Sequence, residues 1–341
     1  MGTLNCGRHT KNDKTRKAKR VNHIPLTIGT WNVRTLLDRD GASGPERRTA
    51  LIGRELGRYN IDIAALSETR LAEEGQICEI GAGYTFFWSG RKSEERRQSG
   101  VGFAIKSALV GKLAGFPKAI NDRLMTMKLP LLNGRKHATI VSVYAPTMTN
   151  EDDVKNKFYE DLHNVLTSVP KGDKLILLGD FNARVGTDTT SWSGIIGKHG
   201  VGNCNSNGLR LLQTCAEHDL LITNTIFRLP MRNRTSWMHP RSKHWHLIDY
   251  VIVRRSDRQD VRVTKSMCGA ECWTDHRLII SKINIHMKPP RRPQGAKMQR
   301  KLNVTRLNSK KMQQSFENML EDRLKPNAAA KQDTETEWRA L

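Results

Sequence analysis

A carboxylate and a carboxamide follow directly after an apolar run in the stretch 174–185. Residues Leu175–Leu178 have the composition of a fully buried strand. Gly179 is expected to end this strand, and Asp180 and Asn182 then fall on the same side of an extended chain, because side chains alternate with period two. Open α/β sheets keep their catalytic groups just past such strand ends. A plain Asx-rich turn is the alternative, since Asp and Asn are common turn residues.

Similar polar residues close or follow the other strands that the apolar pattern predicts. Each one alone has an ordinary explanation, such as a helix cap for Glu68, a half-buried core side chain for Tyr144 or a surface histidine for His276. Their gathering at so many strand ends is harder to explain by chance. The set comprises Asn32, Glu68, Tyr144, Asp180, Asn182, Asp249, Asp275 and His276.

The elements that must position these residues are short, and the strands come in groups instead of alternating strictly with helices. Apolar stripes at helical spacing predict helices from about Pro45 through Leu56, over 151–169 and over 209–218. This order predicts an α/β fold of the α+β type, a four-layer sandwich with two mixed β-sheets face to face and helices outside. The expected strands are 26–32, 61–66, 84–88, 101–106, 139–144, 175–178, 220–225, 247–253 and 277–283.

The charge balance indicates the kind of partner. Lys and Arg outnumber Asp and Glu by 57 to 34, a formal net charge of +23 over 341 residues. Such a balance points to a polyanion, most often nucleic acid. An anionic membrane surface is the alternative, but no run of about 18 apolar residues could span a bilayer, and no signal-peptide core follows the N-terminus. We therefore expect a nuclear or cytoplasmic protein whose partner is DNA and not a membrane.

Six cysteines are scattered through the chain, which predicts reduced thiols and not a disulfide framework. Cys268, Cys272 and His276 share a spacing of four, which is compatible with a metal site. A structural zinc site needs four ligands, however, and no second pair stands out in the sequence. Zinc is therefore the weaker interpretation of these three residues.

Composition divides the chain into four regions. Residues 1–24 are polar and basic and predict a disordered arm, which could serve nuclear localisation, nucleic-acid binding or only solubility. Residues 25–287 contain the predicted strands and helices. Residues 288–299 form a Pro-rich basic linker, and residues 300–341 have helical composition but too little apolar surface to fold alone.

The polar residues at the strand ends lie within motifs that resemble those of the endonuclease/exonuclease/phosphatase superfamily. The motifs occur in the same order, over roughly residues 26–285. Within the superfamily the chain is most similar to the abasic-site-endonuclease-like domain of RTE-type non-LTR retrotransposons and to craniofacial development protein 2-like host proteins. The matching stretches are Trp31-Asn32, Ser67-Glu68-Thr69, Val143-Tyr144-Ala145-Pro146, Gly179-Asp180-Phe181-Asn182-Ala183, Thr235-Ser236-Trp237, Ile248-Asp249-Tyr250 and Thr274-Asp275-His276.

The resemblance implies a DNase I-like fold and a Mg²⁺-dependent DNA endonuclease, with Mn²⁺ as the alternative ion. Glu68 would be the main metal ligand, with Asn32 and Asp275 close by. Asp180 would activate the attacking water, and Asn182 would hold water or phosphate. His276, oriented by Asp249, and Tyr144 would stabilise the developing charge. The nick would leave a 3′-hydroxyl, and a reverse transcriptase or the element RNA would be further partners.

Two positions are less regular. Arg34 stands where the abasic-site enzymes carry another acid. A guanidinium there repels a cation, which predicts weaker metal binding and a phosphate contact instead. Asn203, Asn205 and Asn207 all lie in the region of the family's further asparagines; Asn207 and Trp237 are taken as DNA contacts. A phosphatase or phosphodiesterase of the same superfamily, or an inactive domesticated nucleic-acid-binding protein, are the alternative functions.

Overall fold

The computed structural model describes residues 25–38, 47–131, 136–285 and 309–324. The predicted arm 1–24 and the linker 288–299 lie outside these ranges, as does Pro45. The chain divides into two compact units, Met1–Pro289 and Pro290–Leu341. In the second unit the structure describes one helix, α5 (Lys310–Leu324).

The first unit contains two large mixed sheets. Sheet 1 has seven strands, and all neighbours are antiparallel except the parallel pair β1–β2. In spatial order the strands are β16 (Val261–Met267), β17 (Leu278–Ile283), β1 (Leu26–Asn32), β2 (Ile63–Ser67), β5 (Val101–Lys106), β4 (Tyr84–Ser89) and β3 (Glu74–Glu79).

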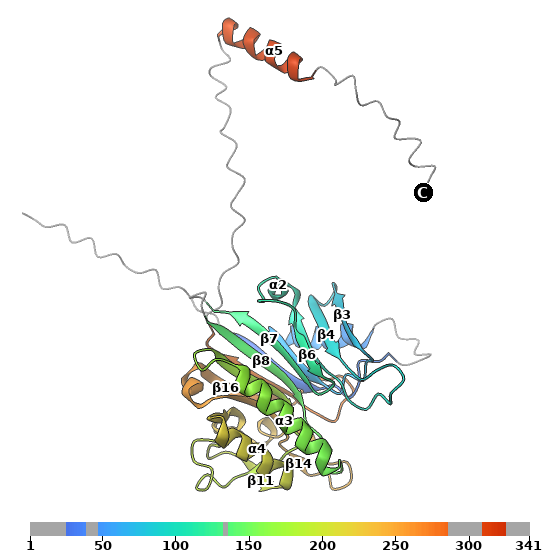
Figure 1. The fold of residues 1–341 in the computed structure, drawn as a ribbon, viewed down its shortest axis with the longest axis vertical. Coiled ribbons are helices and arrows are strands. Elements are labelled where there is room, and N and C mark those ends of the chain that lie inside the picture. The colour runs from blue at the N-terminus through green and yellow to red at the C-terminus, as the bar shows by residue number, and fades with distance from the viewer. Residues whose placement is uncertain (1–24, 39–46, 132–135, 286–308, 325–341) are drawn as a thin grey trace, which may run out of the picture. The chain divides into compact units, whose positions relative to one another are not determined.

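Sheet 2 repeats this plan with six strands and one parallel pair, β8–β9. Its strands β6, β7 and β8 are labelled in Figure 1. Its spatial order is β12 (Leu220–Ile222), β15 (Asp249–Arg254), β9 (Lys174–Asp180), β8 (His137–Tyr144), β7 (Leu124–Pro130) and β6 (Lys118–Asn121). Two short pairs complete the strands that the structure describes in this unit: β10 (Val185–Gly186) with β11 (Val201–Cys204), and β13 (Trp237–Met238) with β14 (Trp245–His246).

Helices cover the outer faces of the sheets, so the predicted four-layer sandwich is confirmed. Helix α3 lies across sheet 2, with α4 beside it (Figure 1), while α1 packs on sheet 1. The bounds are α1 (Arg48–Arg58), α2 (Ser107–Val110), α3 (Asp152–Ser168) and α4 (Ser206–Glu217), with 3₁₀ turns at Thr223–Thr225, Met231–Asn233 and Arg255–Asp260. None of the helices in the described ranges is long and apolar enough to cross a bilayer.

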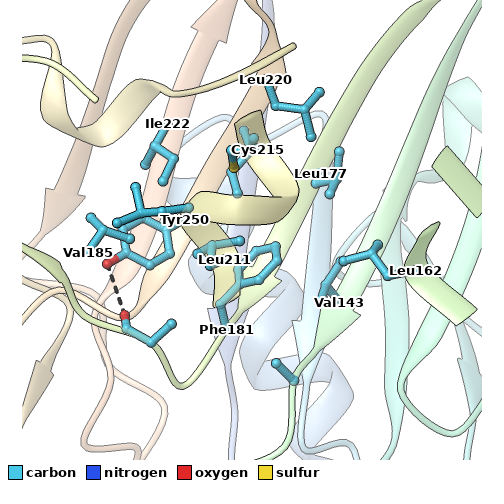
Figure 2. Close-up of a cluster of buried hydrophobic side chains, with 14 of the residues drawn as sticks. Val143, Leu162, Leu177, Phe181, Val185, Leu211, Cys215, Leu220, Ile222 and Tyr250 are labelled. Carbon is cyan, nitrogen blue, oxygen red and sulfur yellow. Dashed lines mark hydrogen bonds between the residues drawn. The ribbon is translucent and has the colours of Figure 1, made fainter. Parts of the chain in front are cut away.

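Three apolar clusters hold the layers together. One lies between the sheets and includes Ile28, Phe103 and Ile176. A second joins sheet 1 to α1 around Trp31. The third joins sheet 2 to α3 and α4, and Figure 2 shows its Phe181 and Tyr250 packed among aliphatic side chains. The Tyr250 hydroxyl lies near the carbonyl oxygens of Ala183 at 3.0 Å and Leu247 at 2.8 Å and can donate to them, which anchors both segments. The core thus extends to the residues beside Asp180 and Asp249.

The expected end of the central strand at Gly179 is wrong, because β9 runs through this residue to Asp180. Gly179 pairs with Val143 on one side and Tyr250 on the other. A Cβ atom at this position would overlap the carbonyl oxygen of Val143. Glycine is therefore required by the close approach of β8 and not by a turn.

We expect Gly179→Ala to destabilise the domain by about 1–3 kcal/mol, the usual cost of overpacking a core position. Urea unfolding followed by tryptophan fluorescence measures this. The matched control is Gly111→Ala, because nothing lies within 4 Å of a Cβ at Gly111. That control should stay within about 0.5 kcal/mol of the wild type. Equal unfolding midpoints for the two variants would contradict the packing argument.

Candidate active site

The candidate site lies where the carboxyl ends of the two parallel strand pairs meet. Asn32 ends β1 opposite Ser67 of β2 in sheet 1, and Tyr144 ends β8 opposite Asp180 of β9 in sheet 2. The Ser67 hydroxyl joins the two sheets, since it donates to the Val143 carbonyl at 3.2 Å and accepts from the Asp180 N–H at 3.4 Å. The geometry therefore brings strand ends from both sheets to one place.

Asn32 connects the two sheets through its side chain. Its fully buried amide nitrogen donates to Glu68 Oε1 at 2.8 Å and to Asp180 Oδ2 at 3.0 Å. Its oxygen accepts the N–H of Arg34 at 2.9 Å. Asn32 is thus placed to hold the two carboxylates by its nitrogen, next to Glu68, the predicted main metal ligand.

Asp180, Asp249 and His276 form a buried group. His276 Nδ1 lies 3.0 Å from Asp249 Oδ2, and His276 Nε2 lies 4.0 Å from Asp180 Oδ2. Burial raises the pKa of Asp180, as does the Asp249 charge, while His276 and hydrogen bonds from Asn182 and Asn32 oppose the rise. Burial alone would lower the pKa of His276, but the charges of Asp249, Asp180 and Asp275 raise it. The group therefore combines a basic carboxylate with an imidazole that favours its protonated form.

Glu68 lies at the partly exposed rim of this group, beside Tyr144 and Arg70. Burial raises the pKa of the Tyr144 phenol, and the charges of Glu68 and Asp180 raise it further. Arg70 Nη2 donates to Glu68 Oε2 at 2.8 Å. Sequence reasoning missed Arg70, whose only sequence signal is its position two residues after Glu68.

Asp275 also has two neighbours from the predicted set. Trp237 Nε1 donates to Asp275 Oδ2 at 3.0 Å, and Arg34 Nε lies 3.7 Å from Asp275 Oδ1. The preceding Thr274 hydroxyl donates to the Asn32 carbonyl at 2.7 Å, which fixes this segment beside β1. Trp237 and Arg34 are therefore held next to an acid and are both placed at the site.

Asn182 and Asn207 lie beside the buried group and bond to the backbone of the surrounding loops. Asn182 has φ of 45°, so the predicted extended chain through this residue is wrong; its N–H turns back to Asp180 Oδ1 at 2.8 Å. The Asn182 amide donates to the Ala145 carbonyl at 2.9 Å. Asn207 is buried and its amide donates to the carbonyls of Pro146 and Asn182, both at 3.0 Å. These contacts support the loops of the site, and Asn205 instead caps α4.

A further aromatic residue was not predicted. Trp273 is 67% exposed, lies two residues before Asp275 and has φ of 55°. The Arg48 guanidinium lies 5.7 Å from the centre of its ring. Its sequence signal would have been an unexplained tryptophan directly before the Thr274-Asp275-His276 motif.

The donor atoms of the site suit a hard divalent cation. Glu68 and Asp275 offer carboxylate oxygens that are partly open to solvent, with side chains 16% and 33% exposed. Mg²⁺ and Mn²⁺ prefer oxygen ligands, and Mg²⁺ usually keeps several waters. Asp180, Asp249 and His276 also bring their ligand atoms within 4.8 Å of one another, but they are buried and His276 Nδ1 already contacts Asp249. Glu68 and Asp275 are therefore the accessible carboxylate donors of the site.

The alternative zinc interpretation of Cys268, Cys272 and His276 has no support among the described residues. Cys268 Sγ contacts the Arg232 carbonyl, Cys272 is buried, and neither joins His276 in a group of converging ligand atoms. The five cysteines in the described ranges are free thiols.

Comparison with known proteins gives matches at three levels. The model of the endonuclease/exonuclease/phosphatase family matches residues 29–276. Craniofacial development protein 2 of Bos taurus is 33% identical over 262 residues, which cover 76% of this chain and 41% of that protein, and the protein of Tragulus javanicus is 32% identical. The chain thus spans about two fifths of the length of these curated relatives.

Two solved structures show the same fold at low identity. The catalytic domain of Xenopus laevis APE2 has a TM-score of 0.57 and 16% identity, over 78% of this chain and 94% of that one. The endonuclease domain of TRAS1, a telomere-specific non-LTR retrotransposon, has a TM-score of 0.51 and 15% identity, over 76% and 98%. The predicted resemblance is confirmed: the chain belongs to the endonuclease/exonuclease/phosphatase family.

Proposed function

We propose that this chain is a Mg²⁺-dependent endonuclease that hydrolyses a DNA phosphodiester and leaves a 3′-hydroxyl. One observation carries the proposal: Asp180, His276 with Asp249, and Glu68 converge where the two sheets meet. This set offers a base, a charged hydrogen-bond donor and a carboxylate for a hard cation in one place. Phosphodiester hydrolysis needs these three groups.

Asp180 acts as the general base for the attacking water. Its Oδ1 accepts from the Asn182 N–H and its Oδ2 from Asn32, which fixes the plane of the carboxylate. Burial raises its pKa and so makes it a stronger base than an exposed aspartate. The proton of the water passes to a carboxylate that is held in one orientation.

His276 supplies the charged donor. Asp249 accepts from Nδ1 and favours the imidazolium, so Nε2 carries a hydrogen. The 4.0 Å between Nε2 and Asp180 Oδ2 is too long for a hydrogen bond, and this hydrogen stays available for a non-bridging phosphate oxygen. Tyr144 is a neutral phenol because its pKa is raised, and it would stabilise the leaving oxygen.

Glu68 and Asp275 would hold the cation, which when bound withdraws charge from the phosphate. Asn32 keeps Glu68 in place, while Thr274 and Trp237 keep Asp275 in place. Arg34 and Arg70, each paired with one of these acids, are the phosphate-binding groups nearest to them.

The choice of DNA as substrate rests on charge and on the relatives. A net charge of +23 favours a long polyanion over a small phosphate ester. The TRAS1 match is the endonuclease domain of a retrotransposon; by this likeness the 3′-hydroxyl left here would prime a reverse transcriptase. Nicking of a supercoiled plasmid with Mg²⁺ tests the function, and release of phosphate from inositol phosphates under the same conditions would contradict it.

Asp180→Asn and His276→Ala should each lower the nicking rate by about two to four orders of magnitude, the range for a general base or a charge-stabilising donor. DNA binding should change little, because neither group alone dominates phosphate contact. The matched controls are Asp153→Asn on the exposed face of α3 and His137→Ala at the start of β8. If a variant keeps more than about a tenth of the wild-type nicking rate at saturating Mg²⁺, the role assigned to that residue is wrong.

Arg34→Asp should lower the Mg²⁺ concentration for half-maximal nicking severalfold, because it replaces a repelling cation beside Asp275 with a ligand. Arg34→Ala should weaken DNA binding by about 1–3 kcal/mol, the cost of a charged hydrogen bond. The control is Arg58→Ala, which removes another exposed arginine paired with a carboxylate, Glu55. Magnesium titrations and DNA affinities equal to wild type for both Arg34 variants would place Arg34 outside the site.

Trp273→Ala should weaken binding of single-stranded or nicked DNA by about 1–3 kcal/mol, the value of one base stacked on an aromatic ring. Trp273→Phe should retain much of that affinity, which a purely structural role would not predict. Phe116→Ala removes another aromatic side chain, 64% exposed, and serves as the control. Equal loss in the alanine and phenylalanine variants would mean that no base stacks there.

A further inference from the structure

Two histidines and a glutamate meet on the surface formed by α3 and α4. His163 belongs to α3, Glu217 is the last residue of α4, and His218 caps that helix. The helices also contact each other through Tyr159 and Asn207, and they lie side by side in Figure 1. This cluster is separate from the residues proposed for catalysis, which lie at the strand ends.

Three possible ligand atoms of this cluster share too few hydrogens to form a hydrogen bond in every contact. His163 Nδ1 lies 3.2 Å from His218 Nε2 and 3.1 Å from Glu217 Oε1. One ring nitrogen carries at most one hydrogen, so His163 Nδ1 cannot satisfy both neighbours fully. If His218 donates instead, the Nδ1 lone pair faces the carboxylate. A single cation between the three atoms would satisfy all of them.

The spacing of these atoms matches a tetrahedral metal site. Zinc binds histidine nitrogen and carboxylate oxygen at about 2.0–2.2 Å, which puts neighbouring tetrahedral ligands about 3.3 Å apart. The two measured separations, 3.2 and 3.1 Å, are close to that value, and all three ligand atoms lie within 4.8 Å of one another. The side chains of His163 and Glu217 are 46% and 59% exposed, so an ion can reach them and keep water as a further ligand.

We infer that His163, Glu217 and His218 form a binding site for a transition-metal ion of the Zn²⁺ class, distinct from the Mg²⁺ site. The two donor sets differ in chemistry. Imidazole nitrogen suits Zn²⁺, whereas the carboxylate oxygens of Glu68 and Asp275 suit Mg²⁺. Bound metal would join the middle of α3 to the end of α4.

Zinc titration of the full chain by calorimetry, in millimolar Mg²⁺, tests the site. We expect one zinc ion per chain to bind here, and His163→Ala and His218→Ala each to weaken this binding at least about tenfold, because each removes one of three protein ligands. Glu217→Gln should weaken it in the same direction. His137→Ala, which removes a histidine beside the single acid Asp173, is the control and should leave the affinity unchanged.

The ligand type distinguishes this site from the exposed cysteines Cys78, Cys204 and Cys268. Co²⁺ bound by histidine and carboxylate gives only weak visible bands, whereas thiolate ligation adds an intense near-ultraviolet band. We expect the wild-type chain with Co²⁺ to show the weak visible bands. His163→Ala and His218→Ala should each lose them. Zinc affinity equal to wild type in His163→Ala and His218→Ala, or a thiolate band that persists in them, would overturn it.

Discussion

The hydrogen bonds of the Asn32 amide to Glu68 and Asp180 are the contacts on which the whole site depends. Glu68 follows sheet 1 and Asp180 ends a strand of sheet 2, so one buried side chain holds carboxylates from both halves of the fold. Two nearby carboxylates repel each other, and burying them costs several kcal/mol unless donors compensate. The apolar cluster between the sheets supplies the rigid packing that keeps these donors in place. Stability and function are therefore linked at this interface.

Backbone strain gathers at the same place. Arg34, Glu68, Arg70, Asn182 and Trp273 all have φ between 45° and 60°, a region that costs non-glycine residues energy. Each lies just past a strand end or next to the Asp275 segment. A left-handed residue there breaks the alternation of side chains and lets neighbours such as Glu68 and Arg70 face each other. The strain is tolerated because the flanking strands are buried and fully paired.

Most of the buried strands could be predicted, because apolar runs such as Leu26–Asn32 and Val101–Lys106 are bounded by polar residues. The inner strand β7 was missed, since Thr126 and Lys128 interrupt its apolar residues. Edge strands such as β3 and β6 were missed as well, since half of their residues face solvent and no apolar run marks them. Gly179 was misinterpreted because glycine punctuates turns more often than it permits close strand packing. The polar residues that the structure brings together at the strand ends were picked out by their motifs. The pairing of Arg70 with Glu68 was not predicted, since it depends on the left-handed conformation of both residues, which composition does not reveal.

Arg34 and Arg70 would affect how the site binds its metal ion and DNA. If Glu68 and Asp275 hold the cation, as proposed, then Arg70 and Arg34 compete with it for the same carboxylates, at 2.8 and 3.7 Å. The net charge of +23 also repels Mg²⁺ while it attracts DNA. A phosphate in the site offers both guanidiniums a partner that suits their planar donors. If phosphate binding moves the arginines away from the carboxylates, the affinity of the carboxylates for the cation rises. By linkage, the bound cation then favours the arginine–phosphate contacts to the same extent. Bound DNA should therefore raise the affinity for the metal ion, and bound metal should raise the affinity for DNA. A site whose carboxylates were not paired with arginines would not show this coupling.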